Sequence, residues 1–204
     1  RRHRVRLGLA PGTEIDGQVV PMGRRATKKV NKAAAQFNME KLRWINAQYI
    51  KAADTGRITD LLVPILTGEG LVDSAVDRVW LERVVGLYKS RMSTLWDFVE
   101  RAKYLFSDDI VISPQVRQEH LKAELAPVLE ALAERLEAVE AFDIASAEAA
   151  FRTFANEKGL KTGDLVHPVR VALTGDTVGP GLFETMAVLG KTRTIARLKK
   201  TFRD

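Results

Sequence analysis

From Lys28 to the C-terminus, this 204-residue chain has apolar residues spaced three and four positions apart, and this periodicity constrains its fold more than any other feature. Such spacing is typical of amphipathic α-helices, whereas strands alternate with a period of two. No run with the length and alternation of a standard strand appears after residue 25. The pattern therefore predicts an all-α fold of two packed helical bundles, with a boundary near Asp108 to Gln115.

Residues that favour helix ends predict where the individual helices begin and stop. Asn38 opens the first helix, which extends through Tyr49. Asp73 or Ser74 opens a later one, and Ser93 caps the helix after that. Several helical segments are followed by a glycine, the residue that most readily adopts the left-handed conformation of a helix end: Gly68, Gly70, Gly159, Gly175 and Gly190.

Two prolines refine this prediction. Pro127 lies within a stretch of helical spacing from Leu121 to Val139, where it predicts a kink or a short break because its ring removes a helical hydrogen bond. Pro168 follows the acidic cap Asp164, and it predicts the first turn of a short helix that runs through residues 169–173.

The first 24 residues follow a different pattern. Apolar residues alternate with arginine or glycine from Val5 to Leu9, and Asp16-Gly17 supplies turn-forming residues. This pattern predicts a short irregular or hairpin arm. We accordingly divide the chain into an arm at 1–28, a first helical subdomain at 29–110 and a second at 111–204.

Lysine and arginine are concentrated near the N-terminal end. The net charge is +6 with an isoelectric point near 9.6. Residues 1–51 hold 12 Lys and Arg against 3 Asp and Glu, whereas the other 153 residues hold 20 against 23. A basic excess favours a polyanionic partner, because cations gain free energy by releasing counterions from phosphates. The alternative, a basic tail that only keeps the protein in solution, stays open.

Composition excludes several other classes of protein. The chain has no cysteine, so it forms neither disulfides nor thiolate metal sites, and nothing indicates an oxidising compartment. Its longest apolar runs, such as Leu61–Leu66, are far shorter than the roughly 20 residues that span a bilayer, and no signal-peptide pattern opens it. We expect a cytoplasmic protein that is not embedded in a membrane.

The residues themselves indicate no catalytic or metal site. The chain lacks a P-loop, a dinucleotide-type glycine motif and a zinc-binding pair of histidines on one helix. Its histidines, His3, His120 and His167, lie far apart, and His167 is interpreted as a structural residue at a helix start. The glutamates from Glu130 to Glu140 lie about one helical turn apart and are interpreted as a solvated helix face.

Two blocks of sequence carry a resemblance to a known family. The first is His167-Pro-Val-Arg-Val-Ala-Leu-Thr-Gly175, followed by Gly179-Pro-Gly-Leu-Phe-Glu184 and Leu189-Gly190-Lys191. The second is Phe37-Asn-Met-Glu-Lys-Leu-Arg-Trp-Ile-Asn-Ala-Gln-Tyr-Ile50. With these blocks, the chain from about residue 29 to residue 204 resembles the C-terminal region of bacterial-type glutamyl-tRNA synthetases, whereas residues 1–28 match neither the catalytic loop nor the tRNA stem-contacting helices of that family.

The resemblance implies an α-helix cage of two helical subdomains that binds the anticodon of tRNA(Glu), in a monomeric protein. It also implies that an upstream Rossmann-type domain attaches glutamate to the tRNA with ATP and Mg²⁺. The His-Ile-Gly-His and Lys-Met-Ser-Lys type motifs of that catalytic domain do not occur in this sequence. This chain alone is therefore expected to be inactive and to hold no cofactor.

The resemblance further assigns anticodon-binding positions. Arg170, Pro180 and Leu182 correspond to residues at the anticodon, and Arg91 corresponds to an arginine that discriminates between anticodon bases. Gly179 stands where some members of the family have a larger polar residue. Arginine suits this role because its planar donors match the edge of an unpaired base, at roughly 1–3 kcal/mol per bidentate contact.

Two further sets of residues have two interpretations each. The basic residues near the C-terminus are candidate phosphate contacts, or charges that complement a helix dipole: Arg193, Arg197, Lys199 and Lys200. The tryptophans could stack on bases, but their place on apolar stripes favours core packing: Trp44, Trp80 and Trp96. A rival hypothesis for the whole chain is a helical protein-interaction module, with the face from Glu130 to Glu140 as its docking surface.

Overall fold

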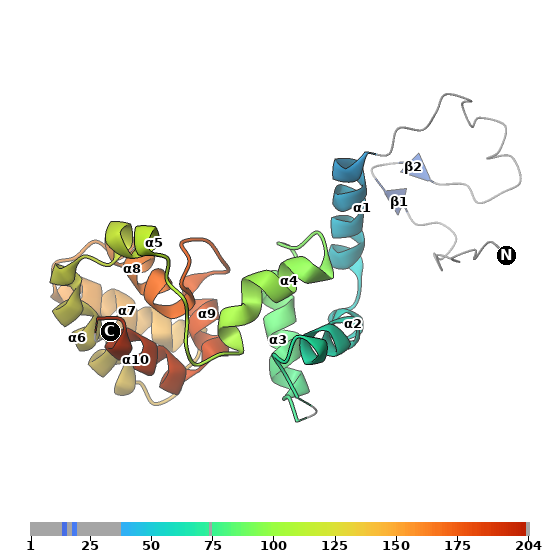
Figure 1. The fold of residues 1–204 in the computed structure, drawn as a ribbon. Coiled ribbons are helices and arrows are strands. Elements are labelled where there is room, and N and C mark those ends of the chain that lie inside the picture. Colours follow the sequence, from blue (N-terminus) through green and yellow to red (C-terminus); the bar gives the residue numbers. More distant parts are fainter. Residues whose placement is uncertain (1–13, 16–17, 20–37, 74, 203–204) are drawn as a thin grey trace, which may run out of the picture. The chain divides into compact units, whose positions relative to one another are not determined.

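The computed structural model describes residues 14–15, 18–19, 38–73 and 75–202. Contacts between Cα atoms divide the chain into two units, residues 1–38 and residues 39–204. In the first unit, β1 (Glu14–Ile15) pairs antiparallel with β2 (Gln18–Val19), as the predicted hairpin arm requires (Figure 1). The predicted alternation from Val5 to Leu9 lies outside the described residues.

The second unit consists of helices, which confirms the all-α prediction (Figure 1). The N-terminal helix group comprises α1 (Met39–Ala52), α2 (Thr55–Gly68), α3 (Arg78–Tyr88), α4 (Leu95–Ala102) and the 3₁₀ turn η2 (Lys103–Leu105). The C-terminal helix group comprises α5 (Pro114–His120), η3 (Ala123–Leu125), α6 (Ala126–Glu137), α7 (Ile144–Glu157), α8 (Thr162–Thr174), α9 (Leu182–Leu189) and α10 (Lys191–Lys200). Residues 106–113, which we call the connecting segment, join the two groups. The subdomain limits at residues 28 and 110 stay a prediction.

The N-terminal helix group is built around α2, α3 and α4. α2 packs against α3 through fully buried side chains: Leu62, Leu66, Leu81, Val84 and Val85. α4 adds Phe98, whose ring meets that of Tyr88 edge-on with centroids 5.6 Å apart. The last residue of α3, Tyr88, is therefore held against α4, next to the segment that contains Arg91.

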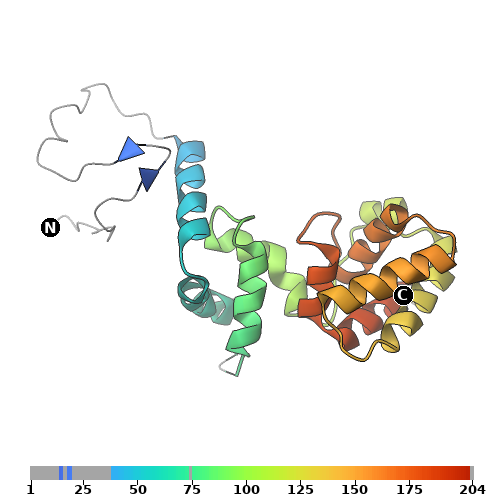
Figure 2. The same ribbon diagram turned by 180° about the vertical axis from the view of Figure 1, so that it is seen from behind.

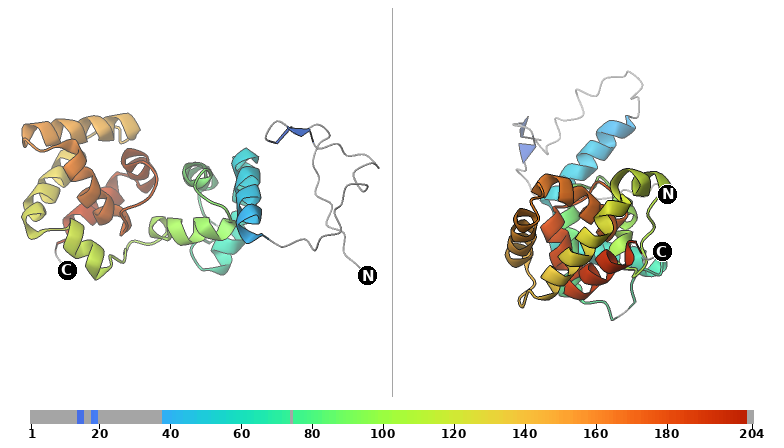
Figure 3. Two further views of the ribbon diagram at one scale, coloured as in Figure 1. Left: turned by 90° about the horizontal axis from the view of Figure 1, so that it is seen from above. Right: turned by 90° about the vertical axis from the view of Figure 1, so that its left-hand side faces the viewer.

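The C-terminal helix group has a second apolar core. α10 packs against α6, and α7 packs against α6 and α9 (Figures 2 and 3). Fully buried side chains come from four of these helices: Leu129, Leu132, Leu136, Phe151, Leu173 and Met186. Because α8 and α9 contribute to this core, the turn between them is held at both ends. None of the helices in the described part of the chain is long and apolar enough to cross a membrane.

The first turn of α3 differs from the capping prediction. Asp77, and not Asp73 or Ser74, precedes the helix, and its carboxylate accepts hydrogen bonds from the backbone N–H groups of Val79 and Trp80. Several residues of the capping type stand close together here, so local preference alone leaves the helix start undecided. Of the two glycines that were expected to end the preceding helix, Gly70 takes a left-handed conformation, with φ +67°. Gly68 is instead an ordinary last residue of α2.

The cap of α4 is Thr94 rather than Ser93. Thr94 and Asp97 form a capping box, in which each side chain accepts a hydrogen bond from the backbone N–H of the other. The Asp97 carboxylate also accepts a hydrogen bond from the Ser93 N–H at 2.7 Å. Partial burial works to raise the pKa of Asp97, but the hydrogen bonds from Ser93 and Thr94 outweigh it and hold the pKa below its usual value.

Asp97→Ala is expected to lower the free energy of unfolding by about 1 kcal/mol, the typical contribution of a helix cap. Because the folded-state pKa of Asp97 is lowered, its contribution is present above the unfolded-state pKa and is lost as the pH falls through the folded-state pKa. Urea unfolding of both proteins at neutral pH and in acid measures this. A stability difference that is as large in acid as at neutral pH would contradict the role of the carboxylate.

Pro168 and Pro127 each lie at a position in their helix that differs from the prediction. Pro168 is inside α8, which already begins at Thr162, and the hydrogen bond that proline removes falls on Asp164, an exposed residue of the first turn. His167 accordingly lies within the helix, where its ring stacks on that of His120 with centroids 6.1 Å apart. Pro127 stands in the first turn of α6, so the predicted break occurs just before it, at residues 121–125.

The tryptophans do not share one environment. Trp80 is partly buried against the core, and its indole N–H donates to the Val188 carbonyl at 2.6 Å, which links α3 to α9. Trp44 and Trp96 are each 52% exposed, so the prediction of core packing is wrong for them. Helical spacing shows that a face is apolar, but it does not show that another element covers that face.

Candidate functional site

A groove of about 790 Å³ lies where the two helix groups and the connecting segment meet. Its walls come from the end of α3, from α4 and η2, from the connecting segment, and from the turn between α8 and α9. The lining residues are Tyr88, Arg91, Glu100, Arg101, Lys103, Tyr104, Ser107, Asp109, Ile110, Val111, Thr174, Asp176, Val178 and Gly179. Arg91 and Gly179, which come from different helix groups, therefore line one concave surface.

The groove combines cationic side chains with exposed apolar ones. Arg91 and Arg101 are exposed, and the Arg91 guanidinium donates to the Leu87 carbonyl at 3.1 Å. On the other wall, Val111 is 91% exposed and Val178 is 75% exposed. Cations attract phosphates and donate to base edges, while apolar side chains provide contact area for the flat faces of unpaired bases. This combination suits a single-stranded nucleic acid.

Two tyrosines, Tyr88 and Tyr104, line part of the groove. Tyr88 is 2% exposed, and its hydroxyl oxygen is 3.0 Å from that of Tyr104. Burial, and then the charge of Tyr104, raise the pKa of Tyr88 far above its usual value. Burial also raises the pKa of Tyr104. Both hydroxyls therefore stay neutral at physiological pH, so the two tyrosines add no charge to the groove.

Arg170 holds the turn between α8 and α9. It is partly buried, and one of its guanidinium nitrogens donates to the Pro180 carbonyl at 2.6 Å. Within the described residues, neither Arg170 nor Arg91 has a carboxylate within the 4.0 Å of an ion pair. A Cβ at Gly179 would lie 3.3 Å from the same guanidinium nitrogen, so the small size of Gly179 gives Arg170 room to reach the turn.

Pro180 and Leu182 support the groove from behind. Both are buried, Leu182 to 4% exposure, and neither is among the residues that line the groove. Leu182 is the first residue of α9 and belongs to the core of the C-terminal helix group. The structure thus brings Arg91 and Gly179 to the surface of the groove and places Arg170, Pro180 and Leu182 in and beneath its wall.

The expected phosphate contacts on α10 are already engaged within the protein. Arg197 is 5% exposed, so its assignment as a phosphate contact is wrong; burial also lowers its pKa. Arg193 forms an ion pair with Asp108 at 3.1 Å, Lys199 with Glu137 at 2.8 Å, and Lys200 with Asp109 at 2.6 Å. Helical spacing placed these residues on a basic helix, but it could not indicate that one side of that helix faces the connecting segment.

Of the residues that line the groove, the sequence analysis singled out Arg91 and Gly179; those that it missed include Arg101, Lys103, Val111 and Val178. Lys103 pairs with Glu100 at 2.7 Å, and it resembles any exposed helix residue in the sequence. The two valines lie outside the helices, where no periodicity distinguishes them. No local signal in the sequence marks the two valines, because they reach the groove through tertiary packing alone.

Comparison with known proteins gives a consistent result. The family model described as "Anticodon binding domain" matches residues 57–202. The chain is 37% identical over 175 residues to a glutamate–tRNA ligase of Thermodesulfovibrio yellowstonii, covering 85% of this chain and 38% of that protein. It is 38% identical over 174 residues to a glutamate–tRNA ligase of Thermus thermophilus, covering 85% of this chain and 36% of that protein.

A solved structure has the same fold. The glutamate tRNA ligase of Elizabethkingia meningosepticum, crystallised in complex with its amino acid, superposes with a TM-score of 0.78 at 27% identity, covering 86% of this chain and 34% of that one. The chain therefore spans well under half the length of the relatives that it matches.

Proposed function

The chain belongs to the anticodon-binding domain family, and on this premise we propose that it binds the anticodon loop of tRNA(Glu) as part of a glutamate–tRNA ligase. The family membership itself implies binding of tRNA. The choice of tRNA(Glu) is supported by the names of the relatives, which are glutamate–tRNA ligases. The relatives give no support to the alternative of a protein-interaction module.

The observation that carries the proposal is the shared groove. Arg91 from the N-terminal helix group and Gly179 from the C-terminal helix group line one surface that also holds exposed valines and further cations. Anticodon bases are unpaired, so they offer both a face and a hydrogen-bonding edge to such a surface. In this proposal Arg91 donates to a base edge, and Arg170 holds the turn that forms the opposite wall.

The reaction of the whole ligase is assigned to parts outside this chain. We place the ATP, Mg²⁺ and glutamate sites in the remainder of the longer protein, since the relatives extend well beyond the matched region. This chain then contributes tRNA selection and no catalytic residue. The same proposal includes a monomeric protein that works in the cytoplasm, where tRNA is charged.

Arg91→Ala is expected to weaken binding of a tRNA(Glu) anticodon stem-loop by roughly 1–3 kcal/mol, or about 5- to 160-fold in Kd, because a base loses its bidentate donor. Fluorescence titration at physiological salt measures this change. Arg152→Ala is the matched control, because Arg152 is an exposed arginine of α7 outside the groove. If the Arg91 and Arg152 variants bind the stem-loop equally well, the base-contacting role of Arg91 is wrong.

A further inference from the structure

We infer that the basic side of α10 positions the anticodon groove from behind, as a clamp on the connecting segment, and does not contact RNA. The clamp consists of Arg193, Arg197 and Lys200, with Arg197 as its central residue. This inference deepens the proposed function and rests on it, since the groove that the clamp holds is the proposed anticodon site.

Arg197 joins three parts of the structure at one guanidinium. One nitrogen donates to the Leu173 carbonyl in α8, and another donates to the carbonyls of Tyr104 and Ser107, each at 2.6 Å. The guanidinium carbon also lies 5.9 Å from the centroid of the Tyr104 ring. Tyr104 and Ser107 line the groove. The Arg197 side chain of α10 therefore holds the backbone of the groove wall.

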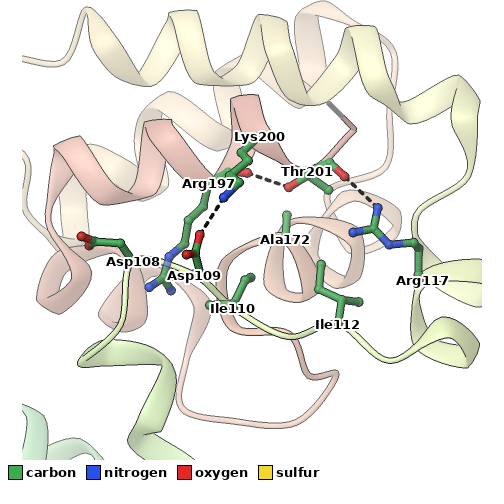
Figure 4. Close-up of a pocket in the computed structure, with 9 residues that line it drawn as sticks. All are labelled: Asp108, Asp109, Ile110, Ile112, Arg117, Ala172, Arg197, Lys200 and Thr201. Atoms are coloured by element: carbon green, nitrogen blue, oxygen red, sulfur yellow. Dashed lines mark hydrogen bonds and ion pairs between the residues drawn. The ribbon is translucent and has the colours of Figure 1, made fainter. Parts of the chain in front are cut away.

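Arg193 and Lys200 extend this contact along the connecting segment. Arg193 donates to the Leu105 carbonyl at 2.9 Å and pairs with Asp108. Lys200 pairs with Asp109, as Figure 4 shows. Positions 193, 197 and 200 follow the spacing of one helix face. The three cations therefore meet the chain from the end of η2 to Asp109 as a single row.

The connecting segment lines two cavities. Asp109 and Ile110 line the groove, and they also line a smaller pocket of about 280 Å³ that contains Arg197, Lys200 and Ala172 (Figure 4). The end of α8 also lies close to the connecting segment, because a Cβ at Gly175 would be only 2.5 Å from the Val111 carbonyl oxygen. The segment is thus held by α10 and passes close to the end of α8, and its residues Asp109 and Ile110 also line the groove.

The positioning role predicts a pattern of binding that a phosphate contact would not produce. A cation that neutralises a phosphate contributes to the salt dependence of binding and contributes equally to all sequences. A clamp residue changes the shape of the groove, so its loss reduces discrimination between anticodons and leaves the salt dependence nearly unchanged. The buried Arg197 can reach a phosphate only by releasing the three carbonyls that it now holds.

The test compares this chain and its variants in binding to a tRNA(Glu) anticodon stem-loop and to one with an exchanged anticodon, across a salt series. Arg197→Lys keeps the charge but loses the fork that reaches three carbonyls. We expect the ratio of the two Kd values to fall by about tenfold, within the range of one base contact, with the salt slope kept. The double variant Arg193→Met with Lys200→Met, at partly exposed positions, tests the same row without a buried change.

Lys199→Met is the control on the same helix, because Lys199 pairs with Glu137 of α6 and not with the connecting segment. It should leave discrimination unchanged. Circular dichroism checks that each variant is folded; if Arg197→Lys unfolds, the double variant decides. Full discrimination in the double variant, with a salt slope lowered by about one for each lost cation, would overturn the clamp and favour phosphate contacts. Failure of the parent chain to discriminate between the stem-loops would instead overturn the proposed function.

Discussion

Arg197→Met is expected to lower the free energy of unfolding by about 3–5 kcal/mol, because three carbonyls lose a hydrogen bond from a charged donor, which contributes roughly 1.5–3 kcal/mol where it is buried, as at Leu173, and less at the part-buried Tyr104 and Ser107 contacts. Arg197 is 5% exposed, so water cannot easily replace the guanidinium. Methionine keeps much of the apolar volume of the side chain, so the change removes hydrogen bonds more than packing. The loss therefore falls on the contact between α10, α8 and the connecting segment.

Urea unfolding followed by circular dichroism measures the effect of the Arg197 substitution as a shift of the midpoint at constant slope. Arg152→Met is the matched control, since the Arg152 side chain is 57% exposed and, among the residues that the structure describes, pairs with Glu148 one turn away on α7. The control should change stability by no more than about 0.5 kcal/mol, as surface ion pairs contribute little. Equal effects at the two positions would show that the hydrogen bonds of Arg197 do not hold the fold together.

Gly175→Ala is expected to lower the free energy of unfolding by about 2–4 kcal/mol. Two effects of the added Cβ contribute to this loss. Gly175 ends α8 with φ +79°, where a residue with a Cβ loses roughly 1–2 kcal/mol. That Cβ would also lie 2.5 Å from the Val111 carbonyl oxygen, which is part of the backbone and cannot move aside by itself. The connecting segment must shift to relieve the contact, so groove binding should weaken together with stability.

Gly159→Ala separates the two contributions to the Gly175 effect. Gly159 ends α7 at φ +65°, and a Cβ there would meet nothing within 4 Å in the described part of the chain. We therefore expect only the conformational cost of about 1–2 kcal/mol at this position. Thermal or urea unfolding of both variants gives the difference, which measures how closely the connecting segment approaches α8. The close approach would be refuted by equal losses of stability in the two variants.

Features that depend on neighbours in the chain were predictable. Gly159, Gly175 and Gly190 end helices as expected, because the need for a left-handed residue is a local property. The caps were less secure: Asp73, Ser74 and Ser93 are all capable of capping, yet Asp77 and Thr94 hold the helix starts. Where several residues could cap a helix with similar free energies, the packing of the helix's apolar face against the rest of the molecule selects one of them.

The all-α architecture was thus accessible from residue type and spacing, since these depend on short stretches of chain, and the resemblance singled out Arg91 and Gly179. Their meeting in one groove, the burial of Arg197 and the exposure of Trp44 were decided by tertiary structure. Helical periodicity indicates which side chains share one face of a helix. It does not indicate what that face contacts, and the free energy of a charged or aromatic side chain depends on that contact. For α10 the partner is the connecting segment, about 90 residues away along the chain, and only folding brings the two together.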